Sequence, residues 1–172
     1  LVLFFIGGLA GLLYDYIHVV YGVLVYRSQS LYGTNVWVFF EFGIAAIIAR
    51  MVAIKLKKRI QFPEVSWSRA GVDSVLLFSA YLATGLFNGK HFEATLILLP
   101  LAMISVASRP SRFIVISSLI GGLCGPLAES MVSASGFFYY TSAWAVPIWL
   151  PLLWVVAICL FVDGVILIEN RK

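Results

Sequence analysis

Apolar residues occur along the chain in six long stretches that are separated by short polar connections. A helix needs about 20 mostly apolar residues to cross about 30 Å of hydrocarbon. The stretches are continuous rather than alternating, which favours helices, so strands are not expected. The predicted fold class is therefore an all-α polytopic membrane bundle, with one domain over residues 1–172. Its six predicted transmembrane helices cover residues 2–24, 36–54, 70–87, 92–106, 113–132 and 145–168.

The composition agrees with lipid as the main solvent of the protein. Hydrophobic residues make up 62% of the chain and charged residues 12%, which is outside the range of ordinary soluble domains. The net charge of +4 does not indicate nucleic-acid binding, because the basic residues gather in short connections between apolar stretches. We therefore expect an integral membrane protein whose surroundings are the lipid bilayer.

The distribution of Lys and Arg predicts the orientation of the bundle. Two connections carry only Arg27 and Lys90, whereas nine basic residues lie at the opposite ends of the predicted helices. Basic loops stay in the cytoplasm, so six helices place both termini on the cytoplasmic side. Aromatic residues near the other helix ends fit an interfacial belt: Trp37, Tyr139, Tyr140, Trp144 and Trp149. The nine basic residues are Lys55, Lys57, Lys58, Arg59, Arg69, Arg109, Arg112, Arg171 and Lys172.

Two pairs of glycines at helical spacing, Gly7 with Gly11 and Gly121 with Gly125, predict close helix contacts. Packing within the bundle is the first interpretation, and contact between copies in a homo-oligomer is the alternative. The two halves of the sequence show no evident internal repeat, which argues against an alternating-access transporter.

Ionisable residues inside apolar stretches must face the bundle interior or a wet cavity, because lipid solvates them poorly. Asp15, His18, Glu41, Glu129 and Asp163 are the residues of this kind. Tyr14 shares a helix face with Asp15 and His18. One interpretation is a site that hydrogen-bonds the hydroxyl of an amphipathic ligand. Its predicted residues are Tyr14, Asp15, His18, Glu41, Tyr81 and Glu129.

Two alternatives for these polar residues stay open. Asp15, His18, Glu41 and Glu129 could form a metal or acid–base site of a small intramembrane enzyme, such as a metal-dependent isomerase. They could instead form an internal hydrogen-bond network of protonated acids. The sequence contains no HExxH, GxSxG, histidine-cluster or P-loop motif. We therefore predict a protein without enzymatic activity, cofactor or metal.

Several short segments resemble, in order and spacing, members of the Insig (insulin-induced gene) family. The segments are the apolar opening at 1–7 with 18–26, Trp67-Ser68, SRPSR at 108–112, GFFYYTS at 136–142 and WLP at 149–151. The chain departs from the family at Ala107 and Ser108, where the family has an acidic residue, and at Glu129, where it has a glutamine.

The resemblance implies a six-helix, non-enzymatic membrane protein with cytosolic termini. Animal members are sterol sensors of the endoplasmic reticulum that bind oxysterols and hold partner membrane proteins. The departures put partner binding of the animal type in doubt. They favour a prokaryotic homologue in the plasma membrane, although a eukaryotic chain would belong in the endoplasmic reticulum. The ligand that the resemblance implies is a sterol-like or diacylglycerol-like lipid.

Overall fold

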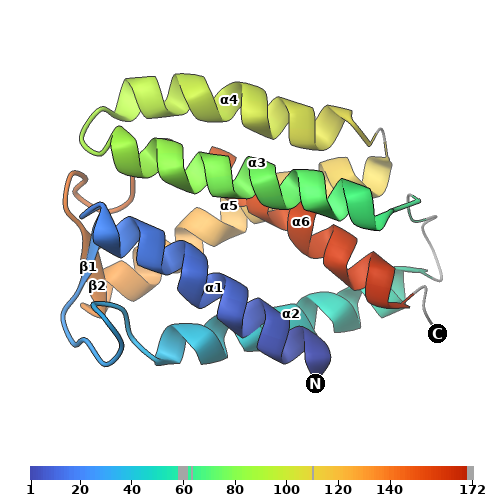
Figure 1. Cartoon of the computed structure of the whole chain (residues 1–172), viewed down its shortest axis with the longest axis horizontal. Helices are drawn as coiled ribbons and strands as arrows, with labels where there is room; N and C mark the ends of the chain where they lie inside the picture. The colour runs from blue at the N-terminus through green and yellow to red at the C-terminus, as the bar shows by residue number, and fades with distance from the viewer. Residues whose placement is uncertain (58–61, 63, 110, 170–172) are drawn as a thin grey trace.

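A computed structural model describes residues 1–57, 62, 64–109 and 111–169 of the protein. Within these residues the chain forms six helices and two short strands (Figure 1). The prediction of an all-α membrane bundle of six helices is confirmed. In chain order the elements are α1 (Val2–Val20), β1 (Leu24–Tyr26), α2 (Trp37–Lys57), α3 (Trp67–Leu86), α4 (His91–Ala107), α5 (Arg112–Ala134), β2 (Phe138–Tyr140) and α6 (Leu150–Glu169).

All six helices run between two ends of the molecule (Figure 1). We call the end with β1 and β2 the strand end. The other end carries Arg69, Arg109 and Arg112 at the ends of α3, α4 and α5, and we call it the basic end. α1 starts and α6 finishes at the basic end, as an even number of crossings requires. Four of the basic residues that predicted the orientation lie outside the described residues: Lys58, Arg59, Arg171 and Lys172.

α6 is the central helix of the bundle. It packs against α2, α3, α4 and α5, while α1 packs mainly against α2. Apolar side chains at its start, including Trp149 and Leu150, are fully buried, and they join the main core at the strand end. α6 begins with Pro151 in its first turn, where the missing N–H costs nothing. The predicted start at residue 145 was therefore too early.

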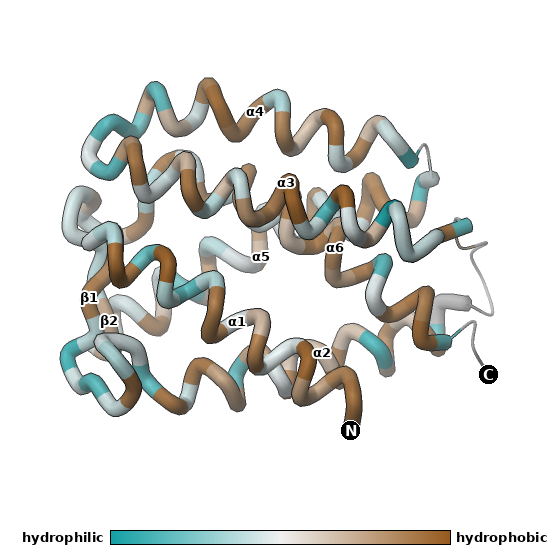
Figure 2. Tube along the Cα trace, in the orientation of Figure 1, coloured by the Kyte–Doolittle hydropathy of each residue, from teal (hydrophilic) through white to brown (hydrophobic). Residues whose placement is uncertain are grey.

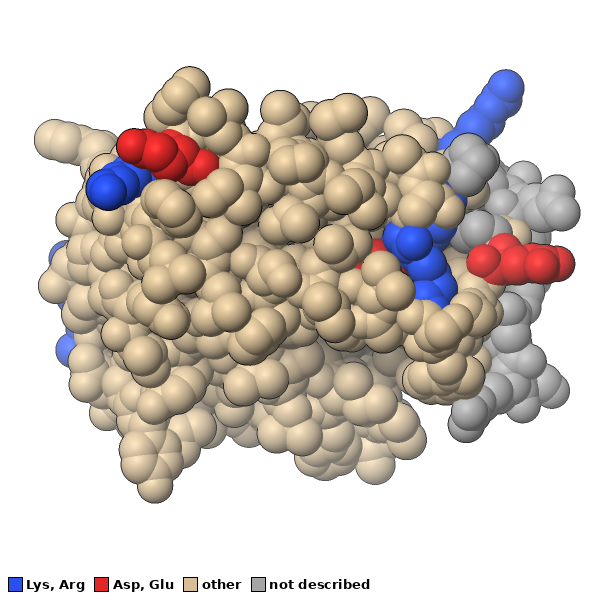
Figure 3. All heavy atoms as spheres, turned by 45° about the horizontal axis from the view of Figure 1, so that its top comes forward, with Lys and Arg blue, Asp and Glu red and all other residues tan. Residues whose placement is uncertain are grey.

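The surface is suited to a bilayer. Four helices are long and apolar enough to cross a membrane: α1, α2, α5 and α6. α4 has 17 residues, and α3 carries Arg69 and Asp73 in its first turns. Figure 2 shows hydrophobic residues along the helices and hydrophilic ones mostly near the two ends. On the face drawn in Figure 3, charged side chains likewise gather at the two ends and leave the middle uncharged.

The expectation that strands are absent was wrong. β1 and β2 pair antiparallel, with Val25 opposite Tyr139 at the centre. α1 ends before Gly22 and α5 before Gly136, and both glycines have positive φ (65° and 82°), which side chains with a Cβ rarely adopt. The chain leaves each helix there and continues extended. The first predicted helix extended to residue 24, so its continuous apolar pattern concealed the turn at Gly22 and the start of β1. The strand β2 was missed because three residues are too few to show an alternating pattern.

The paired glycines pack within the bundle. Gly11 lies against the ring of Phe42 on α2, and Gly125 lies against Trp154 on α6. A Cβ at either position would overlap the neighbouring ring. These glycines therefore bring α1 close to α2 and α5 close to α6, as the first interpretation of their spacing predicted.

Candidate functional site

A cavity of about 40 Å³ lies inside the bundle near the strand end. Five of the six predicted ligand-binding residues line it: Asp15, His18, Glu41, Tyr81 and Glu129. They come from α1, α2, α3 and α5 and meet because each is a polar side chain on an otherwise apolar helix. A space of this size holds a few water molecules or a small polar group.

Two carboxyl groups of the cavity are each bonded to a tyrosine of the strand pair. The Tyr26 hydroxyl on β1 donates to Asp15 Oδ2 at 2.5 Å. The Tyr140 hydroxyl on β2 donates to Glu129 Oε2. Because both tyrosines belong to the strands, these two bonds connect the strand pair to α1 and α5 beside the cavity.

The two tyrosine hydroxyls remain hydrogen-bond donors over a wide pH range. Burial raises the pKa of Tyr26 far above its usual value, and the neighbouring Asp15 carboxylate raises it further. Burial raises the pKa of Tyr140 in the same way, with Glu129 adding to the effect. Both phenols therefore stay protonated at neutral pH and serve as donors to the carboxyl groups.

Glu129 has a second partner, and Asp15 does not. The Trp154 indole Nε1 on α6 donates to Glu129 Oε1 at 2.6 Å, so both oxygens of this carboxyl group are bonded. Among the described residues, the Tyr26 bond is the one hydrogen bond of the Asp15 side chain. Trp37 Nε1 is buried in the same wall and has no acceptor among these residues.

His18 and Tyr81 form the floor of the cavity. His18 is buried, and its Nε2 lies 2.8 Å from Thr84 Oγ1 on α3. Its ring packs on Tyr81 with 4.4 Å between centroids. Tyr14 also stacks on Tyr81, with 5.0 Å between centroids, and does not line the cavity. Tyr14 therefore supports the wall rather than touching its contents.

Glu41 differs from the other cavity residues in its exposure. It lies on α2, and its side chain is exposed, whereas Asp15 and Glu129 are partly buried. Among the described residues, no Lys or Arg lines the cavity. Three carboxyl groups thus share one small space without a basic partner.

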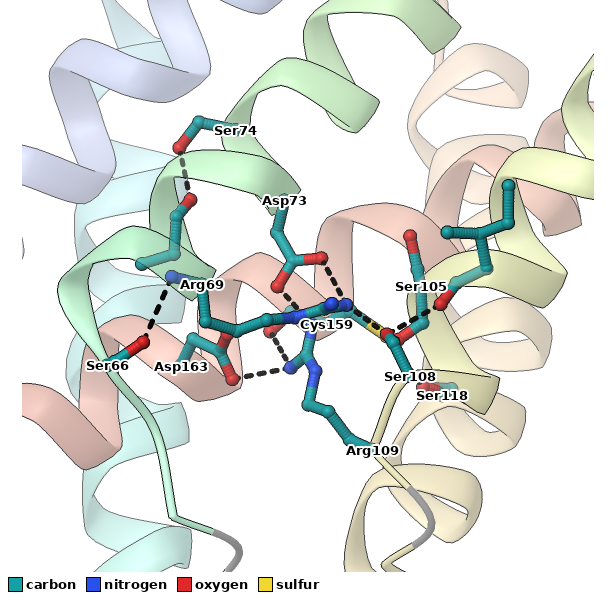
Figure 4. A network of polar contacts seen from close by, with 12 residues as sticks. Ser66, Arg69, Asp73, Ser74, Ser105, Ser108, Arg109, Ser118, Cys159 and Asp163 are labelled. Atoms are coloured by element: carbon teal, nitrogen blue, oxygen red, sulfur yellow. Dashed lines mark hydrogen bonds and ion pairs between the residues drawn. The ribbon is translucent and has the colours of Figure 1, made fainter.

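A second polar cluster lies at the basic end (Figure 4). The Arg109 guanidinium, which follows α4, donates to Asp73 on α3 and to Asp163 on α6. It also donates to the carbonyl oxygen of Cys159 at 3.1 Å. Arg69 adds a 3.1 Å ion pair to Asp73 and a bond to Ser108. We call Arg69, Asp73, Arg109 and Asp163 the ion-pair cluster.

The ion-pair cluster changes one interpretation made from the sequence. Arg109 was counted among the basic residues that set the orientation, yet it is buried, with 5% exposed. Asp73 is fully buried between two arginines. Two acids and two bases balance one another there, which accounts for intramembrane Asp163 without a ligand.

Four cavity residues with hydrogen-bonding side chains were not predicted as ligand-binding residues: Tyr26, Trp37, Tyr140 and Trp154. Tyr26 and Tyr140 lie beyond the helix ends. Trp37 and Trp154 belong to apolar stretches, where a tryptophan is expected and does not indicate a polar site. Tyr140 and Trp37 were assigned to an aromatic belt. Tyr140 is instead buried, while Tyr139 and Trp144 are exposed as such a belt requires.

The side chains do not form a metal site in the described part of the chain. No group of three His, Cys, Asp or Glu residues there is placed to hold a metal ion. The ligand set required by the metal-dependent alternative is therefore not assembled from Asp15, His18, Glu41 and Glu129.

Comparisons with known proteins agree with this architecture. No family model and no curated protein matches the sequence. The structure is similar to the crystal structure of MvINS, a mycobacterial Insig homologue from Mycobacterium vanbaalenii, with a TM-score of 0.81 and 21% sequence identity over 99% of this chain and 94% of that one. A cross-linked trimer of a cysteine variant of MvINS matches with a TM-score of 0.80, at the same identity and coverage. The resemblance to Insig proteins is thus confirmed at the level of the fold.

Proposed function

We propose, from the Insig-like fold and the cavity of unmatched acids, that the protein binds a membrane lipid and has no enzymatic activity. The ligand is a sterol-like or diacylglycerol-like amphipath with a small hydroxylated head. In this role the protein acts as a sensor that regulates partner membrane proteins. The basic end faces the cytoplasm of a prokaryotic cell, and the cavity lies in the outer half of the bilayer.

The observation that carries the proposal is the unused hydrogen-bonding capacity inside the cavity. Among the described residues, the Asp15 side chain accepts one hydrogen bond and has a second oxygen free to accept another, and the buried Trp37 Nε1 has no acceptor. Buried polar groups in proteins are nearly always paired, so the unpaired Trp37 N–H indicates a missing partner. A hydroxyl supplies both a donor and an acceptor. An anionic head is disfavoured, because three carboxyl groups line the space and no Lys or Arg of the described residues does.

The size of the cavity limits what can enter it. About 40 Å³ accommodates a polar head and not a hydrocarbon body. The body of the ligand then lies along the bundle, beside exposed Glu41 and half-buried Glu129. Glu41 belongs to α2 and Glu129 to α5, and within the described chain these two helices pack on α6 rather than on each other. The ligand body can therefore lie between them. Selectivity comes from the head, since apolar contacts gain little over those with bulk lipid.

Self-association is part of the proposal. The glycine pairs are used inside the bundle, so contacts between copies must involve other surfaces. Many apolar side chains on α1 and α5 are exposed and available for them, including Leu9 and Leu123. The cross-linked MvINS trimer provides a precedent with the same fold.

Native mass spectrometry tests lipid binding directly. The detergent-purified protein is offered dioleoylglycerol, cholesterol and dioleoylphosphatidic acid, and we expect a one-to-one adduct with a hydroxylated lipid and none with the phosphate. The double variant Asp15→Asn, Glu41→Gln should lose most of the adduct, because its cavity has exchanged acceptors for donors.

The matched control is Glu93→Gln, which neutralises an exposed acid in the first turn of α4, outside the cavity. It should retain lipid as the wild type does. Wild-type protein that retains neither hydroxylated lipid, or retains phosphatidic acid best, would contradict the proposed function.

A further inference from the structure

Two distant segments of the chain share one pattern of residues. Each has two adjacent glycines, a third glycine three positions on, an acid four positions later, a glycine seven positions after the acid and a tyrosine four positions after that. Every member recurs 114 positions later. The first set is Gly7, Gly8, Gly11, Asp15, Gly22 and Tyr26; the second is Gly121, Gly122, Gly125, Glu129, Gly136 and Tyr140.

The contacts of these residues recur as well. The glycines of each segment pack against a second helix, and the residues that they contact there correspond with a shift of 112 positions. Three contacts repeat in this way. Gly7 contacts Ala46 and Gly121 contacts Ile158; Gly8 contacts the Phe39 carbonyl and Gly122 the Pro151 carbonyl; Gly11 contacts Phe42 and Gly125 contacts Trp154. Tyr26 packs edge-on against Trp37 at 5.7 Å, and Tyr140 does so against Trp149 at 6.3 Å. We call α1–β1–α2 the first unit and α5–β2–α6 the second unit.

The two units are related by an approximate two-fold axis that passes through the cavity. Val25 and Tyr139, which correspond under the shift, face each other at the centre of the strand pair. Phe42 and Trp154, which also correspond, stack with their ring planes 7° apart. Six corresponding pairs line the cavity: Asp15/Glu129, His18/Val132, Leu24/Phe138, Tyr26/Tyr140, Glu41/Leu153 and Phe42/Trp154.

Differences between corresponding residues make the cavity polar on one side. His18 and Glu41 in the first unit correspond to Val132 and Leu153 in the second. In the second unit, Trp154 completes the hydrogen bonding of the acid. Its counterpart in the first unit is Phe42, which has no donor. The first-unit acid, Asp15, therefore lacks the partner that the second-unit acid has.

We infer that the chain is a degenerate duplication, and that the ligand hydroxyl binds the first unit by donating to Asp15 and accepting from Trp37 Nε1. In the first unit the hydroxyl thus takes the place that the Trp154 indole takes in the second. Tyr26 lies beside both groups, bonded to Asp15 and packed on Trp37. Glu129 is a positioning residue for the strand pair and does not touch the head. This inference rests on the proposed function and specifies its site.

Two probes with the same acyl chains separate the two hydrogen bonds. Dioleoylglycerol has a free hydroxyl that both donates and accepts, whereas its methyl ether only accepts. The wild-type protein should prefer the free hydroxyl about ten-fold, which is the effect of one donated bond to a charged or polar partner. Relative adduct yields in native mass spectrometry measure this preference.

Each variant has its own expected signature. Asp15→Asn keeps an acceptor for Tyr26 and turns an NH₂ group toward the head, so the preference should fall to about two-fold or less. Trp37→Phe removes the donor that both probes use. The affinity for each probe should therefore fall about five-fold, and the preference for dioleoylglycerol over its methyl ether should stay the same. The empty Trp37→Phe protein loses no hydrogen bond, because this N–H has no partner among the described residues, so any fall in its melting temperature comes from the smaller ring. Glu129→Gln should lower the melting temperature and keep the preference.

The outcomes distinguish this inference from the proposed function. Retention of neither probe by the wild type overturns both. Equal retention of the two probes, or loss of the preference in Glu129→Gln but not in Asp15→Asn, overturns the inference and leaves lipid binding standing. If Asp15→Asn does not fold, the Trp37→Phe result decides: unchanged affinity for both probes overturns the inference.

Discussion

The cavity and the ion-pair cluster both bring acids into the interior of this apolar chain, and they are built in opposite ways. The ion-pair cluster matches two acids with two bases, and Asp73 and Asp163 are fully buried in it. The cavity has three acids and, among the described residues, no Lys or Arg, and Glu41 is exposed. Bonds from tyrosine and tryptophan satisfy the cavity only in part.

The difference indicates which polar residues stabilise the fold and which are available to a ligand. The ion-pair cluster balances its charges and joins α3, α6 and the connection after α4. Among the described residues, Arg69 Nε, Arg109 Nε and Asp163 Oδ2 are also buried there without a hydrogen-bond partner, but none of these residues lines the cavity. The cavity has a carboxyl group with one hydrogen bond, Asp15, and an unpaired donor, Trp37 Nε1, beside open space. Neither intramembrane charge nor an unpaired atom alone therefore identifies a binding site; unpaired polar groups that line a cavity do.

Removal of Arg109 should have the largest effect of the changes considered. Arg109→Met leaves Asp73 and Asp163 buried without their shared base. Loss of one partner of a buried ion pair costs about 3 to 5 kcal/mol, so we expect a marked fall in the melting temperature of the detergent-solubilised protein. Arg112→Met is the control, because Arg112 is exposed and lies nearby in the sequence, at the start of α5.

A double variant tests whether charge balance is the cause. Arg109→Met, Asp163→Asn removes one acid along with the base, keeps the Arg69–Asp73 ion pair and should recover most of the lost stability. If the single variant is as stable as the wild type, the ion-pair cluster does not hold the basic end together, and the contrast with the cavity fails.

Loss of the two tyrosine hydroxyls should have an intermediate effect. Tyr26→Phe and Tyr140→Phe each remove a hydrogen bond between the strand pair and a carboxyl group, at a cost of about 1.5 to 3 kcal/mol per bond. Thermal unfolding measures the loss, and the double variant should be close to additive. Tyr139→Phe serves as the control, since Tyr139 lies on the same strand and is exposed. A double variant as stable as this control would show that the strand pair is held by other contacts.

The helices could be predicted from the sequence, and so could most of the cavity. Continuous apolar runs fix where six helices lie, and the bilayer requires Asp15, Glu41 and Glu129 to turn inward, which brings them together. Arg109 could not be interpreted correctly, because a buried base and a loop base look alike until their neighbours are known. Trp37 was assigned to the aromatic belt, because the sequence does not show whether an indole N–H finds an acceptor.

The duplication escaped sequence analysis because it is confined to few positions. The corresponding residues are glycines, acids and tyrosines fixed by close packing, helix termination and hydrogen bonding. Most other apolar positions have diverged, since any side chain of suitable size is tolerated against lipid. The change of shift from 114 to 112 positions between the two helices further blurs an alignment. Contacts such as Gly11 with Phe42 and Gly125 with Trp154 make the correspondence visible.

The smallest predicted effect concerns alkaline pH. The raised pKa values of Tyr26 and Tyr140 mean that the unfolded chain loses these two protons first, at about pH 10, while the folded protein keeps them. Their contribution to stability is therefore complete well below pH 10 and is lost as the pH rises through this value. The loss of stability is about 0.4 kcal/mol per tyrosine at pH 10 and grows above it. Melting temperatures measured from about pH 8 to 10.5 should fall more steeply for the wild type than for the Tyr26→Phe, Tyr140→Phe variant, because lysines and the other tyrosines titrate alike in both. Parallel curves would mean that these phenols reach water in the folded protein, and the strand pair would then not seal the cavity.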